Sequence, residues 1–288
     1  MNAALFPGQG IDAGQVLAAL DRDHPLTAAA SDLLGYDLVH RVEQISRQPR
    51  RVMPTSLGQP AIFVAGVTSF ESALQRGETF DYLLGHSLGE YTALVAGRSI
   101  SFRHGLALVA ARGTAMQRAG ARSAGGMAAV LGLDLERVEA IARSRQVTVA
   151  NDNSPRQVVV SGDPHALTVL ADQVRTEGGR CVLLPVEGAF HSTAMLPAAD
   201  ALSRALFTIE IRTPSIPVIS NVSARPYRAP GEIRRLLETQ LTGRVRFREC
   251  ALYLLERGVD RFVDVGPGEV VGGIVRSIQR SLPEPVDA

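Results

Sequence analysis

The stretch YLLGHSLGEYTALVA, residues 82–96, decides the fold. It opens with a short apolar run at residues 82–84, which is typical of a buried strand. The run passes directly into the turn GHSLG (85–89), and helical spacing follows over residues 90–96. A strand, a tight glycine-flanked turn around a serine, and a helix together form a nucleophile elbow. The strand followed by a helix predicts an α/β fold. The free N–H groups at the start of that helix favour developing negative charge, which predicts Ser87 as a nucleophile.

The chain on either side of this stretch alternates short apolar runs with segments of helical periodicity. This alternation predicts the large, hydrolase-like part of an α/β protein. Strands are expected at residues 3–6, 82–84, 218–220 and 261–265, and helices at 16–39 with a break at Pro25, 60–74, 90–96, 191–206, 232–241, 247–257 and 270–278.

The middle of the chain has a different order of elements, βαββαβ, which is the ferredoxin-like pattern. We expect strands at 126–133, 147–150, 157–161 and 180–186, a turn at NDNSP (151–155), and helices at 134–145 and 163–177. The sequence therefore predicts a large hydrolase-like subdomain of residues 1–124 and 188–288, interrupted by a small ferredoxin-like subdomain at residues 125–187.

The composition excludes several classes of function. A formal net charge of +1 lacks the basic excess of a nucleic-acid-binding protein. All thirty basic residues are arginines, so a Walker phosphate loop and lysine Schiff-base chemistry are excluded. The two cysteines, Cys181 and Cys250, lie far apart without metal-ligand spacing, which predicts no metal site and a reducing cytoplasm. We expect no secretory signal in MNAALFPGQG, and the apolar runs are too short to cross a membrane.

A nucleophilic serine needs a base, and the chain has six histidines. His191 stands in GAFHS (188–192), where a strand ends at a glycine and a helix is expected, a position suited to a cleft. His86 adjoins the serine and is interpreted as a packing residue; the others, in polar or helical surroundings, are interpreted as surface residues: His24, His40, His104 and His165. No acidic third member is apparent. Ordinary α/β-hydrolases have their histidine near the C-terminus, whereas here almost a hundred residues follow His191 and a whole subdomain separates it from Ser87, which argues against the ordinary esterase layout.

A second glycine-rich turn, FPGQG (6–10), follows the first strand. Its two glycines let the backbone approach a ligand and offer an N–H to an oxyanion. A plain tight turn is the alternative interpretation.

These motifs occur in a fixed order along practically the whole chain. The order is FPGQG (6–10), GHSLGEYTAL (85–94), RGxxMQ (112–117), NSPxQVVVSG (153–162), GAFHS (188–192), NV (221–222) and VGPG (265–268). The set resembles malonyl-CoA:acyl carrier protein transacylases and polyketide synthase acyltransferases, here as a discrete, trans-acting chain. That family has a hydrolase-like subdomain with an inserted ferredoxin-like one.

The resemblance implies a role for each motif. Ser87 would form the acyl-enzyme and His191 would transfer the proton, with the backbone N–H groups of Gln9 and Leu88 as the oxyanion hole. The family holds its histidine with a backbone carbonyl, which by position would belong to Arg246 in GRVRF (243–247).

Several further positions concern the substrate. Arg112 would bind the free carboxylate of a malonyl-type group, since a guanidinium matches that anion in a bidentate pair. Phe190 resembles the malonyl-selective form of its loop, with core packing as the alternative. Asn153, and with it Asn151, would contact the pantetheine arm or simply build the NDNSP turn. Ile11-Asp12 departs from the family's usual Ser-Gln, so the loop beside the acyl pocket can differ.

The resemblance implies malonyl-CoA:acyl carrier protein S-acyltransferase activity in fatty acid or polyketide biosynthesis. The partners would be an acyl carrier protein and malonyl-CoA or a related acyl-CoA, without a bound cofactor, since coenzyme A is a substrate carrier. Arginine clusters at 47–51 and 244–248 would suit an acidic carrier protein, although solvated arginines are the simpler interpretation. An editing acyl hydrolase of the same fold is the alternative, and a docking module without catalysis is a third hypothesis. We expect a monomer.

Overall fold

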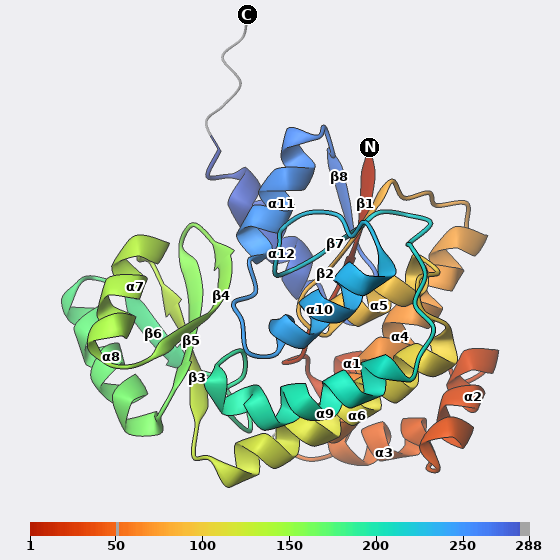
Figure 1. Cartoon of the computed structure of the whole chain (residues 1–288), viewed down its shortest axis with the longest axis horizontal. Coiled ribbons are helices and arrows are strands. Elements are labelled where there is room, and N and C mark those ends of the chain that lie inside the picture. The colour runs from red at the N-terminus through yellow and green to blue at the C-terminus, as the bar shows by residue number, and fades with distance from the viewer. Residues whose placement is uncertain (50–51, 283–288) are drawn as a thin grey trace, which may run out of the picture.

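Two β-sheets organise residues 1–49 and 52–282, which the computed structural model describes (Figure 1). The first sheet is parallel, in the order β7-β2-β1-β8. The second is antiparallel, in the order β4-β5-β3-β6. The strands are β1 (Asn2–Phe6), β2 (Tyr82–Gly85), β3 (Gly126–Leu131), β4 (Thr148–Ser154), β5 (Gln157–Gly162), β6 (Arg180–Leu183), β7 (Val218–Ile219) and β8 (Arg261–Asp264).

The parallel sheet is covered by helices on both faces, which explains its continuous apolar strands. Side chains alternate along β1: Ala4 and Phe6 pack into the core beneath one face, and Ala3 and Leu5 pack into the core beneath the other. The helices of this subdomain are α1 (Ala13–Ala19), α2 (Pro25–Leu34), α3 (Leu38–Ser46), α4 (Thr55–Gln75), α5 (Gly89–Ala96), α6 (Phe102–Arg122), α9 (Leu196–Phe207), α10 (Pro230–Gln240), α11 (Phe247–Glu256) and α12 (Val270–Gln279), with the short 3₁₀ helix η1 (Thr193–Met195).

The small subdomain packs α7 (Leu135–Ser144) and α8 (Pro164–Thr176) against the antiparallel sheet. Asp134 and Asp163 cap these helices through their side chains. The strand order has β3 and β5 in the centre, which is the ferredoxin-like arrangement. The predicted fold class is therefore confirmed, while the boundaries at residues 125 and 187 stay a prediction.

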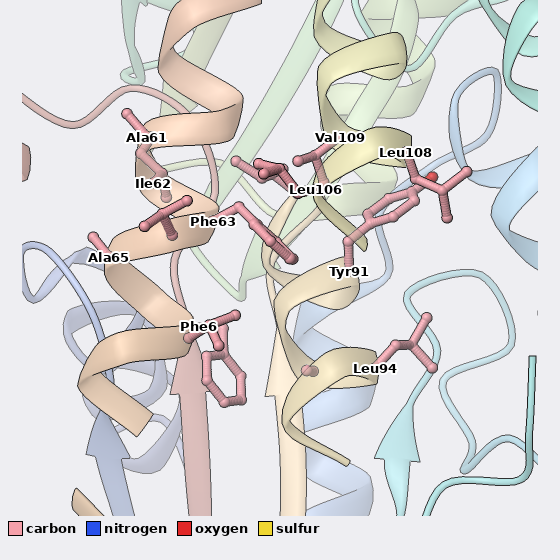
Figure 2. Packing of buried hydrophobic residues seen from close by; sticks show 14 of the residues in the cluster. Phe6, Ala61, Ile62, Phe63, Ala65, Tyr91, Leu94, Leu106, Leu108 and Val109 are labelled. Atoms are coloured by element: carbon pink, nitrogen blue, oxygen red, sulfur yellow. The ribbon is translucent and has the colours of Figure 1, made fainter. Parts of the chain in front are cut away.

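One long helix was not predicted from the sequence. Residues 102–122 form α6, although glycines at 105, 113 and 120 weaken the helical signal. The structure gives a reason for each glycine. A Cβ at Gly105 would lie 2.8 Å from the Phe63 ring. A Cβ at Gly113 would lie 2.8 Å from the Thr55 carbonyl oxygen, and a Cβ at Gly120 would lie 1.9 Å from the Glu187 carbonyl oxygen. The glycines thus permit the close packing of α6 that is visible around Phe63 in Figure 2.

Two other local predictions were wrong. Residues 151–154 continue β4 instead of forming a turn, so the hairpin to β5 is tighter than expected. The helix expected from residue 191 begins only with η1, because His191 has φ = +57°, a left-handed conformation that no α-helix contains.

The two subdomains are joined by backbone pairing as well as by the connecting chain. Asn151 of β4 bridges Val245 in parallel, just before α11. Beside this bridge, the buried carboxylate of Asp152 pairs with Arg248 at 2.9 Å. These contacts place the β4 edge next to the carboxyl ends of β1 and β2. Among the helices described, none is both long and apolar enough to cross a membrane.

Candidate active site

The turn after β2 holds Ser87 in a strained, left-handed conformation with φ = +51°. Glycines on either side make the turn possible. A Cβ on Gly85 would lie 1.9 Å from the Gly89 carbonyl carbon, and one on Gly89 would lie 2.1 Å from the Phe6 carbonyl oxygen. The Ser87 N–H donates to Asn221 Oδ1 at 2.7 Å, which fixes the turn from the other side. The hydroxyl therefore stands at the carboxyl edge of the parallel sheet, where α/β folds bind ligands.

His191 lies beside this hydroxyl, although it is 104 positions away from Ser87 in the sequence. Its Nε2 lies 2.8 Å from Ser87 Oγ, and its Nδ1 lies 2.8 Å from the Gln240 carbonyl oxygen. Because a carbonyl only accepts, Nδ1 carries the proton and Nε2 is free to accept from the serine. Burial, followed by the charge of Arg112, lowers the pKa of His191 to about 3. The imidazole is therefore neutral and able to act as a base near pH 7.

The carbonyl that orients His191 belongs to Gln240 and not to Arg246, so that prediction was wrong. Gln240 ends α10, where carbonyls have no intrahelical donor. The Arg246 carbonyl is already used, since it accepts the Cys250 N–H at 3.0 Å in the first turn of α11.

Arg112 lies on α6, is almost fully buried, and points at the same serine. Its Nη2 donates to Ser87 Oγ at 3.0 Å and to Gln240 Oε1 at 3.1 Å, and its Nη1 donates to Gln59 Oε1 at 2.8 Å. Burial lowers the pKa of Arg112, yet a guanidinium keeps its charge. Within residues 1–49 and 52–282, no carboxylate forms a salt bridge with it. A buried cation without an anionic partner is suited to bind an anionic ligand.

Of the remaining predicted residues, Gln9, Phe190, Asn151 and Asn153 border one cavity of about 270 Å³ that also contains Ser87 and His191, whereas Leu88 is not part of its lining. Gln9 follows β1, and Phe190 precedes the histidine with its carbonyl accepting from Ser161 Oγ at 2.5 Å. Leu88 is the N-cap residue of α5, so its backbone lies at the positive end of that helix.

The small subdomain supplies the opposite wall of this cavity. Asn153 Oδ1 lies 2.8 Å from Nε2 of the half-buried His86, whose ring also packs 5.2 Å from that of Phe247. Asn153 Nδ2 donates to Gln157 at 3.3 Å, whereas Asn151 Oδ1 is buried without a hydrogen bond. The cavity therefore lies between the two subdomains.

The sequence analysis missed three amides that support the site. Gln59 and Gln240 hold Arg112, and Asn221 holds Ser87 and, through Nδ2, the Gly85 carbonyl at 2.8 Å. Only Asn221 had a signal, as part of the motif NV (221–222). The glutamines lie on helices without a recognisable pattern around them.

The arginine clusters proposed for a carrier protein are less free than the sequence indicated. Arg244, Arg246 and Arg248 all pair with acidic side chains of this chain. In the other cluster, Arg50 and Arg51 lie outside the described residues. Of the residues described, no three histidine, cysteine, aspartate or glutamate side chains form a group that could hold a metal ion.

A serine on a nucleophile elbow, hydrogen-bonded to a neutral histidine on a parallel α/β sheet, defines the class of serine acyl-transfer enzymes. The profile of the acyl transferase domain matches residues 5–284. This chain belongs to that acyl transferase family.

Its relatives are similar over nearly all of this chain. The polyketide biosynthesis protein ThaF of Burkholderia thailandensis is 40% identical over 96% of this chain, which spans only 24% of ThaF. The polyketide biosynthesis malonyl CoA-acyl carrier protein transacylase BaeC of Bacillus velezensis is 37% identical, with 97% of each chain covered. The structure of the malonyl CoA-acyl carrier protein transacylase from Coxiella burnetii superimposes with a TM-score of 0.90 at 34% identity, covering 97% of this chain and 91% of that one.

Proposed function

We propose that this chain transfers a malonyl group from coenzyme A to the phosphopantetheine thiol of an acyl carrier protein. The observation that carries the proposal is the buried guanidinium of Arg112, which donates to Ser87 Oγ and has no carboxylate partner among the described residues. A malonyl thioester has the missing carboxylate two bonds from its reactive carbonyl. The names of the relatives support the same substrates.

The reaction has two halves. Ser87 Oγ attacks the thioester carbonyl carbon while His191 Nε2 takes the hydroxyl proton, and the oxyanion accepts from the N–H groups of Gln9 and Leu88. The C–S bond breaks, and the coenzyme A thiolate takes the proton from His191. The carrier thiol then gives its proton to His191 and attacks the carbonyl carbon of the acyl-serine, the C–Oγ bond breaks, and Ser87 Oγ takes the proton back from His191.

Each remaining residue has a proposed role in substrate selection. Arg112 binds the malonyl carboxylate, Phe190 limits space beside the α-carbon, and Asn153 faces the pantetheine arm. Coenzyme A is a substrate, and the chemistry needs no resident cofactor. The protein would function in the cytoplasm, and the free thiols of Cys181 and Cys250 are consistent with that reducing compartment. That the chain is a monomer stays a prediction.

The test is the intact mass of the protein after incubation with malonyl-CoA or acetyl-CoA. We expect a malonyl adduct on the wild type, little acetyl adduct, and no adduct on Ser87→Ala. The loaded protein is then given a holo carrier protein. Malonyl transfer to the carrier supports the proposal, whereas release of the acyl group to water faster than transfer would establish the hydrolase instead.

A second measurement concerns Phe190, whose ring borders the cavity. Phe190→Ala should raise the loading of methylmalonyl-CoA relative to malonyl-CoA by about tenfold, because one extra methyl group is discriminated by roughly that factor. An unchanged ratio would leave Phe190 as a packing residue only.

A further inference from the structure

Glu90 is a buried acidic residue that the acyl-transfer reaction does not use directly. It lies in the first turn of α5, three positions after Ser87, and has no exposed surface. Four groups approach its carboxylate, and all are donors. Tyr227 Oη donates to Oε1; Gln240 Nε2 at 2.5 Å and the Asn221 N–H at 3.2 Å donate to Oε2. The Ser220 hydroxyl is the fourth. The Glu90 carboxylate thus accepts hydrogen bonds from all its neighbours and donates none, as expected of its ionised form.

Two of these donors belong to the residues that hold the reactive groups. Gln240 accepts from Arg112 at its side-chain oxygen, faces His191 with its backbone carbonyl, and donates from Nε2 to the Ser87 carbonyl at 3.1 Å. Asn221 accepts the Ser87 N–H. A single carboxylate oxygen, Oε2 of Glu90, is thus the common acceptor for both supports.

The charges explain why the Gln240 amide has this orientation. Its oxygen faces the guanidinium of Arg112, and its NH₂ group faces the carboxylate of Glu90. The amide therefore lies between a buried cation and a buried anion, each of which fixes one end of it. A neutral group at position 90 would leave the amide free to reverse, and Arg112 would then face an NH₂ group.

We propose that Glu90 is a positioning residue whose carboxylate, through Gln240 and Asn221, holds Ser87, His191 and Arg112 in their reactive arrangement. The proposal rests on the proposed function only for the role of Arg112.

The protonation of Glu90 should matter near neutral pH. Burial raises the pKa of Glu90 to about 7, while the hydrogen bond from Tyr227 opposes the increase. The other ionisable groups around it are Tyr91 on its own helix, Arg112 on α6 and Cys250 on α11; Arg112 is the one cation among these. Because the ionised carboxylate holds the supports, reactivity should increase with pH through about 7.

The experiment measures the rate at which a fluorophosphonate labels Ser87 as a function of pH. In this reaction Ser87 Oγ bonds to phosphorus, fluoride leaves, and His191 takes the proton, so no acyl substrate is involved. The wild type should show a rise near pH 7, well separated from the titration of His191 at about 3. Glu90→Gln should lose this rise and label about a hundredfold more slowly at the plateau, since small displacements of reacting groups have effects of this size.

Tyr227→Phe is the second test of the proposal, and it can be measured even if Glu90→Gln does not fold. Removing the hydroxyl takes away a hydrogen bond that stabilises the carboxylate, so the rise should move to higher pH. Thr68→Val, which removes a buried hydroxyl that donates to carbonyls of its own helix α4, is the matched control and should leave the midpoint unchanged. A midpoint unaffected by both Glu90→Gln and Tyr227→Phe would overturn the proposal.

Malonyl-CoA loading of the wild type is measured in parallel. A wild type that reacts with the fluorophosphonate but never with malonyl-CoA contradicts the proposed function and leaves the test of Glu90 intact.

Discussion

Replacing Arg112 with alanine should remove the preference for a dicarboxylic acyl group. The guanidinium points at Ser87 from α6 and would bind the malonyl carboxylate in a bidentate pair. Acetyl-CoA has no second carboxylate, so it gains nothing from this contact. The ratio of malonyl to acetyl loading therefore isolates the interaction from any general damage to the site.

The expected magnitude follows from two charge-assisted hydrogen bonds. Each contributes about 1.5–3 kcal/mol, so both contribute about 3–6 kcal/mol. At about 1.4 kcal/mol per factor of ten, the malonyl-to-acetyl ratio should fall by roughly 10² to 10⁴ in Arg112→Ala. Arg112→Lys keeps the charge but not the planar fork, and should lose about 10- to 100-fold.

The assay is rapid-quench measurement of acyl-enzyme formation with each thioester, expressed as kcat/KM. Thermal unfolding of the same variants controls for stability, because Arg112 also binds Gln59 and Gln240. A malonyl-to-acetyl ratio within threefold of the wild type in Arg112→Ala would refute the carboxylate clamp, whatever the absolute rates.

Three further outcomes concern stability. The pKa of His191 is about 3 in the folded protein and about 6.5 in the unfolded chain, so the unfolded chain binds more protons between these values. The free energy of unfolding should therefore fall as the pH decreases below about 6.5. A smaller decrease of the Tm with acid in His191→Gln than in the wild type would confirm this. Arg248→Ala leaves the buried Asp152 carboxylate unpaired and should cost about 3 kcal/mol in urea unfolding; a loss below about 0.5 kcal/mol would contradict it. Gly89→Ala places a Cβ 2.1 Å from a carbonyl oxygen and should prevent folding, whereas Gly231→Ala, with open space around it, should express and melt like the wild type; equal behaviour of the two would argue against the strained elbow.

The sequence was most informative where a local rule determines the structure. Apolar runs, helical periodicity and glycine turns identified the strands of the parallel sheet and both helices of the small subdomain. It failed at α6, where glycines needed for tertiary packing resemble helix breakers. It also failed at the start of the helix after His191, because nothing local indicates that a histidine adopts positive φ.

The site divides in the same way. Ser87 could be identified from its own turn, and His191 and Arg112 from ordered motifs. The carbonyl of Gln240 could not, because which helix end lies beside an imidazole 49 residues away is decided by tertiary packing alone. Glu90 was visible in the motif GHSLGEYTAL (85–94), but its burial and its four donors could be recognised only in three dimensions.

The cavity between the subdomains separates reactivity from recognition along the chain. Ser87, His191 and Arg112 come from the segments around the parallel sheet, whereas Asn151 and Asn153 come from the inserted sheet. Under the proposed function, a substitution of Asn151, whose Oδ1 has no hydrogen-bond partner, would alter recognition of the thioester arm, whereas one of Asn153 would also remove the contact with His86 beside the elbow. Asn151 is therefore the position in this wall where the pocket can be redesigned without removing a hydrogen bond of its side-chain oxygen.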